Sequence, residues 1–251
     1  MKVSIITVCY NSAATIEDTI KSVLSQTYPN IEHIIIDGGS TDGTLDVIER
    51  YRKKVAVVVS EPDRGIYDAM NKGIARASGD IIGTLNADDF YAYPDVIESV
   101  VRVMEQSKAD VCWGDLEYVS FRDTTKVVRY WRSSEYAPGK FRRGWHPPHP
   151  TFFVRTRVYE KYGTFNIDFK IAADYELMLR LLEKHRVHSA YIARTLVKMR
   201  TGGASNFWSP MVIFRANAES YRAWKINNLP VHWWSILAKP FSKLIQLIKK
   251  R

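Results

Sequence analysis

Cysteine is scarce in this 251-residue sequence, because Cys9 and Cys112 are the only two and both lie in apolar, strand-like stretches. Two such cysteines indicate reduced thiols in a cytosolic protein rather than a disulfide framework. The loop His146-Pro147-Pro148-His149 contains two possible metal ligands, but no cysteine lies near it. It is therefore a poor zinc-binding pattern.

Long apolar runs are absent as well. The first apolar run stops at Val8, before the polar Asn11 and Ser12, and no stretch is apolar enough to span a bilayer. We therefore expect neither a membrane-spanning helix nor a signal peptide. Internal repeats and low-complexity segments are also missing. Because 46% of the residues are hydrophobic, we expect one domain with a full core and a short appendage.

Acidic residues are outnumbered, since 36 lysines and arginines and 27 aspartates and glutamates give a net charge of +9 at pH 7. The basic residues are dispersed and no nucleic-acid-binding motif accompanies them, so we expect no nucleic-acid partner. They concentrate near the C-terminus, where a predicted helix follows Trp233 and Trp234 and is kinked at Pro240. Its apolar face holds Leu237, Phe241, Leu244, Ile245 and Ile248, and its basic face holds Lys239, Lys243 and Lys250.

A basic amphipathic helix with tryptophans at its start is suited to lie on an anionic membrane surface. Packing of this helix on the domain or on another subunit is the alternative. We favour the membrane, and we treat residues 206–251 as a helical, membrane-associating appendage.

Strand and helix patterns alternate along the first 90 residues. Predicted strands are Val3–Val8, Ile31–Ile36, Val55–Val59 and the run that ends at Leu85, and predicted helices cover 13–26, 44–52 and 66–75. This alternation predicts a mostly parallel α/β sheet flanked by helices, with right-handed crossovers. Ligands of such sheets bind beyond the carboxyl ends of the strands.

Polar side chains follow each predicted strand and should meet at that edge. The last strand leads into Asn86, Asp88 and Asp89. Exposed carboxylates after a buried strand suit a hard divalent cation, whose remaining ligands are often phosphate oxygens. The alternative is that Asp88 and Asp89 only cap the following helix.

Four ordered motifs carry a family resemblance. They are the segments at 3–11 (VSIITVCYN), 36–44 (IDGGSTDGT), 61–73 (EPDRGIYDAMNKG) and 86–89 (NADD). Together they resemble family 2 glycosyltransferases, and more narrowly the bacterial branch that builds O-antigen and exopolysaccharide repeat units. The resemblance extends over residues 1–205. It implies a GT-A (Rossmann-like) fold, a nucleotide-diphosphate sugar donor and inversion at the anomeric carbon, with 1–105 binding the donor and 106–205 the acceptor.

The resemblance also implies roles for single residues. Asp37 matches a contact to uracil or ribose, although it can also close the Gly38-Gly39 turn, and Ser40 and Asp42 fit helix caps better. Arg64 is preferred to Lys72 for offsetting diphosphate charge. The implied donor contacts are Thr7, Asn11, Asp37, Asp63, Arg64, Asn86, Ala87 and Arg200.

Asp88 matches the last acid of the family's Asp-x-Asp signature, which makes it the expected ligand for Mg²⁺ or Mn²⁺. The chain departs from the signature at Asn86, whose amide oxygen brings no charge to a cation. A bound cation would act as a Lewis acid on the departing nucleoside diphosphate.

Asp174 is the expected general base that takes the proton of the acceptor hydroxyl. It lies at a predicted helix start, where the helix dipole favours the ionised carboxylate, and its alternative role is a plain N-cap. The family usually has Glu-Asp here, whereas this chain has Ala173-Asp174. Glu176 is the second candidate for the base.

Acceptor-side residues are expected in the proline-rich loop, with Trp145 stacking on a sugar face and His149 close to sugar or pyrophosphate. The segment 199–205, which contains Arg200, resembles the family's loop that closes over the donor; the Gly202-Gly203 pair also fits a plain connection.

The resemblance implies transfer of a UDP-linked hexose or N-acetylhexosamine to a polyprenyl-diphosphate-linked glycan at the cytoplasmic face of the membrane. One rival is a sugar nucleotidyltransferase, but the segment 9–14 lacks the Gly-rich, basic phosphate loop of that class. The other rival is an inactive sugar-nucleotide-binding or scaffold subunit, which Asn86 and Ala173 favour.

Overall fold

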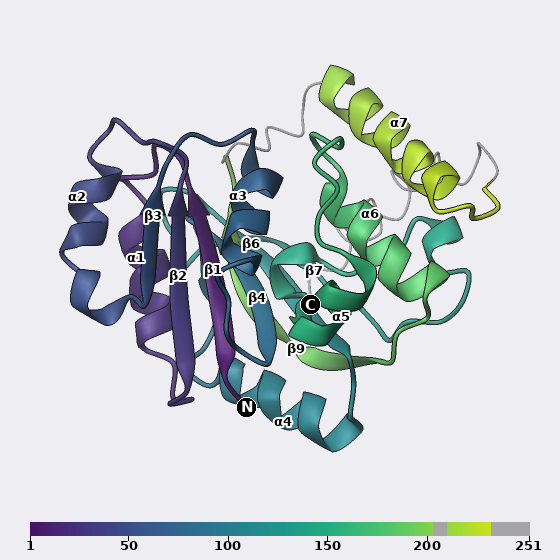
Figure 1. The fold of residues 1–251 in the computed structure, drawn as a ribbon, viewed down its shortest axis with the longest axis horizontal. Helices are drawn as coiled ribbons and strands as arrows, with labels where there is room; N and C mark the ends of the chain where they lie inside the picture. Colours follow the sequence, from purple (N-terminus) through teal and green to yellow (C-terminus); the bar gives the residue numbers. More distant parts are fainter. Residues whose placement is uncertain (203–209, 232–251) are drawn as a thin grey trace.

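The structure, a computed structural model, describes residues 1–202 and 210–231. One curved sheet runs through the molecule, with helices on both of its faces (Figure 1). Nine strands are assigned in the described residues, and eight follow the order β3-β2-β1-β4-β8-β6-β9-β5, with β7 paired to β6.

The N-terminal half of the sheet is parallel. It consists of β1 (Val3–Cys9), β2 (Ile31–Asp37), β3 (Val57–Ser60) and β4 (Ile81–Asn86). Strand β1 pairs with both β2 and β4, and all seven of its residues are buried. Strands covered on both faces need such continuous runs of apolar residues. The predicted parallel sheet is therefore confirmed in this half.

Helices connect these strands. Helices α1 (Ile16–Leu24) and α2 (Thr44–Glu49) lie to one side of the sheet and α3 (Ile66–Ile74) lies on its opposite face (Figure 1). A short 3₁₀ turn, Arg52–Lys54, precedes β3. Each predicted helix and strand of this half is present, with ends that differ by a few residues.

The C-terminal half mixes strand directions. It contains β5 (Asp89–Tyr91), β6 (Val111–Val119), β7 (Val127–Trp131), β8 (Phe153–Arg155) and β9 (Ser189–Arg200). Strand β8 is antiparallel to β4 and β6, whereas β9 is parallel to β6 and antiparallel to β5. The pairing of β5 with β9 brings Asp89 opposite Met199, so the chain after β4 meets the end of β9.

Four helices complete the described part of the chain. They are α4 (Val96–Ser107), α5 (Thr156–Tyr162), α6 (Ala173–Leu179), which continues as the π-turn Arg180–Lys184, and α7 (Pro210–Ile226). Short 3₁₀ turns are formed by Phe141–Arg143 and His149–Thr151. Helix α7 lies beside α6 at the upper right of Figure 1.

Helix α7 falls in the region that the sequence assigns to a membrane-associating appendage. Its Ala223 and Trp224 are buried, and the indole of Trp224 donates a hydrogen bond of 2.9 Å to the hydroxyl of Tyr175 in α6. This part of the region therefore packs on the core of the C-terminal half. The predicted basic amphipathic helix after Trp233 lies outside the described residues.

No helix within residues 1–202 or 210–231 has the length and apolar character needed to cross a membrane.

Candidate functional site

Asp37 ends β2 and is completely buried. Its carboxylate accepts hydrogen bonds from the amides of Gly39 and Ser40 at 3.1 and 2.9 Å, from the hydroxyl of Ser60 at 2.7 Å, and from the hydroxyl of Ser40. Burial raises the pKa of Asp37, but these hydrogen bonds outweigh it and hold the pKa below its usual value. The carboxylate thus organises the turn after β2, which was one of the two roles expected for it.

Asn11 lies in the loop after β1 and has a left-handed backbone, with φ of 49°. Its side-chain oxygen accepts the amide of Thr41 at 2.9 Å, and its own amide donates to the Ser40 hydroxyl at 2.8 Å. Asp42 accepts the amide of Thr44 at 3.0 Å at the start of α2, which is the capping role predicted for it. Asn11 and Asp37 therefore shape one loop cluster at the carboxyl ends of β1 and β2.

Asp63 lies against this cluster. A Cβ atom on Gly38 would come within 2.5 Å of an Asp63 carboxylate oxygen, so only glycine allows this close approach. The ring of Tyr10 lies on the same side of Gly38 and is 63% exposed. An open aromatic ring beside two carboxylates is a surface on which a planar base can stack. Tyr10 lies in the first family motif, but no role was assigned to it.

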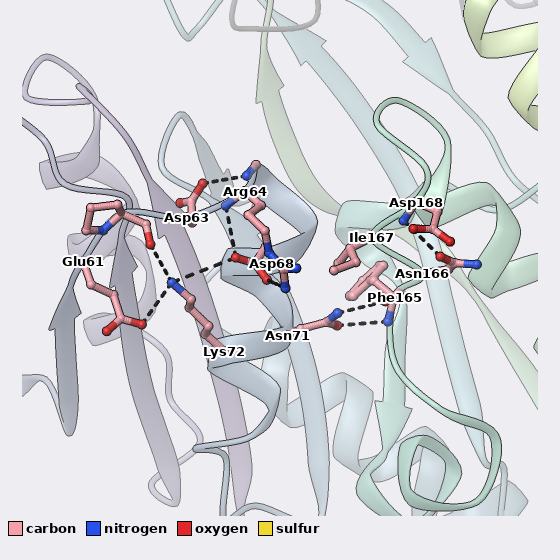
Figure 2. Close-up of polar contacts among 12 residues, drawn as sticks. Glu61, Asp63, Arg64, Asp68, Asn71, Lys72, Phe165, Asn166, Ile167 and Asp168 are labelled. Atoms are coloured by element: carbon pink, nitrogen blue, oxygen red, sulfur yellow. Dashed lines mark hydrogen bonds and ion pairs between the residues drawn. The ribbon is translucent and has the colours of Figure 1, made fainter.

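The two basic residues considered for the diphosphate flank α3: Arg64 precedes the helix and Lys72 lies in its last turn (Figure 2). Arg64 pairs with Asp68 at 3.0 Å, and its side chain is 70% exposed. Lys72 contacts Glu61 at 3.0 Å and the carbonyl of Pro62 at 2.8 Å, and its side chain is 22% exposed. Arg64 is the more accessible of the two cations, in line with the preference for it.

Two of the expected donor contacts lie inside the protein. Thr7 is fully buried within β1, and its hydroxyl is hydrogen-bonded to Nε2 of His33 at 2.9 Å. Ala87 is 4% exposed and packs in the cluster formed by α1 and α2. Their side chains support the sheet and offer almost no surface to a ligand.

Asn86, Asp88 and Asp89 form an acidic cluster where β4 ends. The Asn86 amide nitrogen donates to Asp89 Oδ2 at 3.1 Å. Within the described residues, Asn86 Oδ1 and Asp89 Oδ1 are buried and have no hydrogen-bond partner. A buried oxygen without a hydrogen bond lowers the stability of the folded protein. The two oxygens therefore indicate a position where a bound ion or ligand supplies the missing contacts.

Burial raises the pKa of both carboxylates. For Asp88 the charge of Arg200 partly opposes the effect, whereas for Asp89 the charge of Asp88 adds to it and the pKa lies well above its usual range. Two carboxylates this close cannot both ionise cheaply unless a cation joins them.

These residues fit a divalent cation. Half-buried Asp88 and the two unpartnered oxygens are the hard donors that Mg²⁺ and Mn²⁺ prefer. No cluster of three or more His, Cys, Asp or Glu ligands is found in residues 1–202 and 210–231. Asp88, the predicted ligand, could therefore hold a cation only together with oxygens of a bound diphosphate, with Asp89 beside it.

Arg200, the last residue of β9, reaches this cluster. Its guanidinium donates to the carbonyl oxygen of Asp88 at 2.9 Å and pairs with Asp18 of α1, and it is 5% exposed. It also lies 5.0 Å from the ring centre of Phe90. The expected proximity of Arg200 to the Asp88 region is present, but Asp18 and the Asp88 carbonyl already occupy the guanidinium.

Asp174 lies in the first turn of α6. Its Oδ1 accepts the amide of Tyr175 at 2.8 Å and the hydroxyl of Tyr67 at 3.1 Å. Tyr67 also donates to the carbonyl of Ile171 at 2.8 Å, so it ties α3 to the loop before α6. No partner for Asp174 Oδ2 is found among the described residues. That oxygen is free to accept a proton.

Glu176, the second candidate for the base, is excluded by its surroundings. It is 2% exposed, pairs with Arg180 at 2.9 Å and accepts a hydrogen bond of 2.9 Å from Asn227. A carboxylate buried in this way holds α6 and α7 together and cannot meet an acceptor hydroxyl.

Tyr118, near the end of β6, connects the two acidic positions. Burial is the main cause of its raised pKa; the charge of Arg129 opposes it, and the charges of Asp89 and Asp174 add to it. Both carboxylates therefore lie near the same tyrosine, although they are 85 positions apart in the sequence. Asp174 and the acidic cluster face one region.

The two acceptor-side candidates are packed more tightly than expected. His149 is 8% exposed, lies 3.5 Å from the Thr84 hydroxyl and contacts the ring of Phe165. Burial lowers its pKa, and the charge of Asp174 partly opposes this, so the imidazole is near the base. Trp145 contacts the rings of Trp113, Tyr136 and Phe141. These ring contacts make Trp145 part of the core packing. Only the part of its ring that these contacts leave exposed could touch a sugar.

Glu219 of α7 is a functional candidate that no motif in the sequence indicates. Its carboxylate accepts the backbone amides of Lys170, Ile171 and Ala172 at 3.0, 2.9 and 2.8 Å. These three residues lead directly into α6 and Asp174. A helix distant in sequence therefore fixes the backbone that presents the candidate base.

Comparison with known families identifies the chain. The model of the family described as "Glycosyl transferase family 2" matches residues 4–167 of this chain. The protein belongs to glycosyltransferase family 2. An uncharacterized glycosyltransferase of Mycobacterium tuberculosis is 35% identical over 71% of this chain and 68% of its own. A PGL/p-HBAD biosynthesis glycosyltransferase of Mycobacterium bovis is 28% identical over 81% of this chain and 78% of its own.

Solved structures share the fold of this glycosyltransferase. Residues 1–349 of TarS from S. aureus, in complex with UDP-GlcNAc, superpose with a TM-score of 0.69 at 17% identity, over 96% of this chain and 73% of that one. The mannosyltransferase PcManGT from Pyrobaculum calidifontis, in complex with GDP-Man and Mn²⁺, gives a TM-score of 0.64 at 18% identity, over 100% and 76%. The predicted GT-A fold is confirmed.

Glu219→Gln removes one of the two acceptor oxygens that hold residues 170–172. Because small displacements of a reacting group can cost up to about 100-fold in rate, we expect kcat for sugar transfer to fall at least about 10-fold, with donor KM nearly unchanged. Steady-state kinetics would measure both values. Arg215→Gln, an exposed change on the same helix, is the control, and an unchanged kcat for Glu219→Gln would contradict the positioning role.

Asp89→Asn tests the electrostatic strain in the acidic cluster. The pKa of the Asp89 carboxyl is higher in the folded than in the unfolded protein, where it is about 3.9. At a pH above about 3.9 the carboxyl ionises more easily in the unfolded chain, so its ionisation lowers the free energy of unfolding. Below that pH the carboxyl is protonated in both states and the destabilisation disappears. Without divalent cations, we expect the variant to melt above the wild type at pH 8, with the difference shrinking towards pH 4.

Thermal melts across this pH range provide the measurement, where 1 kcal/mol corresponds to about 2–4 °C for a chain of this size. Addition of Mn²⁺ should raise the melting temperature of the wild type more than that of the variant. Asp46→Asn, an exposed change on α2, should show neither effect. A lower melting temperature of Asp89→Asn at pH 8 would show that the carboxylate is not strained.

Proposed function

We propose that this glycosyltransferase transfers a hexose or N-acetylhexosamine from a UDP-sugar to a lipid-linked glycan, with inversion at the anomeric carbon. One observation carries the proposal: Asp174 of α6 and Asp89 of the acidic cluster lie near the same buried tyrosine, Tyr118, although they come from opposite halves of the chain. A proton acceptor and a site for leaving-group charge must lie on either side of one anomeric carbon in such a reaction.

The donor nucleotide would lie over the loops after β1 and β2. The exposed ring of Tyr10 would stack on the base, and Asp63, close to Gly38, would accept a hydrogen bond from the base or ribose. Arg64 is exposed and can swing from Asp68 towards phosphate charge. The bound UDP-GlcNAc of TarS supports a UDP-linked donor, since that protein shares this fold.

Asp174 Oδ2 would take the proton of the acceptor hydroxyl as that oxygen attacks the anomeric carbon. The bond from this carbon to the diphosphate breaks in the same step, so a single displacement inverts the configuration. Tyr67 and the amide of Tyr175 hold Oδ1 and aim Oδ2. A divalent ion bound at Asp88 would neutralise charge on the nucleoside diphosphate, as the Mn²⁺ complex of PcManGT suggests.

The acceptor is proposed to be a polyprenyl-diphosphate-linked glycan of a cell-surface polysaccharide such as O-antigen. The relative assigned to PGL/p-HBAD biosynthesis supports a role in surface glycoconjugates. A lipid-linked acceptor would require the enzyme at the cytoplasmic face of the membrane, where the basic C-terminal residues could bind anionic lipids.

Asp174→Asn should abolish proton removal and preserve donor binding. We expect transfer to fall by about 100- to 10,000-fold, the usual contribution of a general base, while UDP-sugar affinity stays within about twofold. Transfer of radiolabelled sugar to membrane lipid extract and calorimetric donor titration would measure the two quantities. Asp168→Asn, a 72% exposed carboxylate in the preceding loop, is the control.

Asp88→Ala separates the enzyme from a scaffold. The variant should lose Mn²⁺-dependent donor binding and transfer together. A wild-type protein that binds UDP-sugar but never releases UDP, with any acceptor extract, would favour the inactive subunit.

For the candidate base, near-native transfer by Asp174→Asn would remove that residue from the mechanism.

Replacing Lys243, Lys249 and Lys250 with glutamine tests membrane binding. Each basic residue near an anionic surface contributes about 1 kcal/mol, so we expect partitioning onto phosphatidylglycerol vesicles to fall about 100-fold at low salt. Co-sedimentation measures this, with Arg52, Lys53 and Lys54 replaced by glutamine as a control of equal charge. Equal loss in both triple variants would indicate nonspecific attraction by net charge.

A further inference from the structure

A cavity of about 410 Å³ lies where β6, β7 and β9 meet, and none of the proposed donor residues lines it. Its volume lies at the lower end of the range of about 300–1,000 Å³ that is usual for small-molecule sites. Its walls carry three aromatic rings, one carboxylate and two guanidinium groups. These belong to Tyr130, Trp131, Tyr191, Asp115, Arg132 and Arg194.

An irregularity in the sheet opens this cavity. Gly114 of β6 pairs with Ile192 of β9, but the next residue, Asp115, pairs with Thr195. Ala193 and Arg194 are therefore extra residues on β9, and both line the cavity. Bulges of this kind are common next to binding sites because they redirect side chains out of the regular pleat.

Asp115 is held in a fixed orientation. Its Oδ1 accepts the hydroxyl of Tyr191 and the amide of Ser133, both at 2.7 Å. No partner for its Oδ2 is found in residues 1–202 and 210–231. The carboxylate thus presents one oxygen, already oriented, to a ligand hydroxyl.

The two arginines differ in their freedom. Arg194 is locked by two hydrogen bonds to Asp95, at 2.7 and 2.8 Å, and by the ring of Tyr93 at 4.2 Å. Arg132 is exposed, and its guanidinium forms no hydrogen bond or ion pair within the described part of the chain. Arg132 is therefore available as a donor beside the carboxylate.

Trp131 separates the cavity from the candidate active site. Its ring is parallel to that of Tyr118, at 6.5 Å between centres, and meets the ring of His146 edge-on at 5.1 Å. Tyr118 lies close enough to Asp89 and Asp174 for their charges to raise its pKa. The ring of His146 contacts Tyr175, the residue after Asp174. Two aromatic rings, those of Trp131 and Tyr118, therefore lie between a ligand in the cavity and the reacting groups.

This chemistry matches a sugar ring better than other ligands. A pyranose has an apolar C–H face that packs on aromatic rings and a rim of hydroxyls that need both acceptors and donors. An alkyl chain would leave Asp115 and Arg132 without partners on burial. A polyphosphate would meet the carboxylate of Asp115 and only one unpaired cation.

We propose that this cavity is a subsite for one pyranose unit of the acceptor glycan, distinct from the unit that receives the transferred sugar. The identification of the ligand as acceptor rests on the proposed function, whereas the binding of a sugar ring does not. Asp115 accepts a ring hydroxyl, Arg132 donates to another oxygen, and Tyr130 and Tyr191 supply the aromatic surface.

Saturation-transfer NMR of the full chain with methyl glycosides of glucose, N-acetylglucosamine and glucuronic acid tests the subsite. We expect at least one glycoside to bind with a dissociation constant of about 1–10 mM, a normal affinity for a ligand of this size. Asp115→Asn, Arg132→Ala and Tyr130→Ala should each weaken that binding at least about tenfold. Lys126→Ala, an exposed change of equal charge before β7, should not.

Hydrolysis of UDP-sugar by the same variants distinguishes this proposal from the proposed function. The cavity variants should retain wild-type hydrolysis and raise only the KM for a glycan acceptor. Glycoside binding by a protein that never cleaves UDP-sugar would overturn the function and leave the subsite standing. Absence of binding for the whole panel, or binding that no cavity variant weakens, would overturn the subsite.

Discussion

Two neighbouring carboxylates held out of water at the end of β4 are the constraint around which the site is arranged. Asp89 is fully buried, Asp88 is next to it, and burial together with their mutual repulsion raises the pKa of Asp89 well above its usual range. The positive charge of Arg200 partly offsets the cost of ionising these carboxylates. Arg200 comes from the far end of β9, and β5 pairs with β9 at Asp89 itself. A protein selected for stability alone would replace one of these acids, so their retention favours a cationic ligand.

The candidate base is built by parts of the chain that are distant in sequence. The N-terminal half contributes Tyr67 from α3, whose hydroxyl donates to Asp174 Oδ1 and to the Ile171 carbonyl. The C-terminal helix α7 contributes Glu219, which binds the three amides before α6. Asn71 adds a third tie, because its side chain exchanges two hydrogen bonds with the backbone of Phe165 across the same boundary (Figure 2). The contacts that join the N-terminal and C-terminal halves therefore also fix the orientation of the candidate base.

The sequence was most informative where a residue's neighbours in the chain are also its neighbours in space. Buried apolar runs and the helices between them predicted the parallel half, and Asp42 was correctly predicted as a cap, because these features depend on local spacing. The packing of α7, the role of Glu219 and every strand pair of the second half except β6–β7 depend on contacts over more than 40 positions, which no local pattern reveals. Asp174 was preferred to Glu176 as the base because of the family resemblance, and the contacts of buried Glu176 with Arg180 and Asn227 then excluded the second candidate. Thr7 belongs to a diagnostic motif, yet its hydroxyl faces His33 inside the sheet.

The departure from the Asp-x-Asp signature at Asn86 has a physical explanation in this arrangement. An aspartate at position 86 would place a third carboxylate beside Asp88 and the buried Asp89, and it could not donate a hydrogen bond. The amide of Asn86 instead donates to Asp89 Oδ2 at 3.1 Å, and this bond lowers the cost of ionising Asp89. The chain thus has carboxyl groups at 88 and 89, and Asn86 Oδ1 is a buried neutral oxygen without a hydrogen-bond partner among the described residues. Asn86 therefore removes one carboxylate from the signature, while Asp88 and Asp89 still place two carboxyl groups at the end of β4.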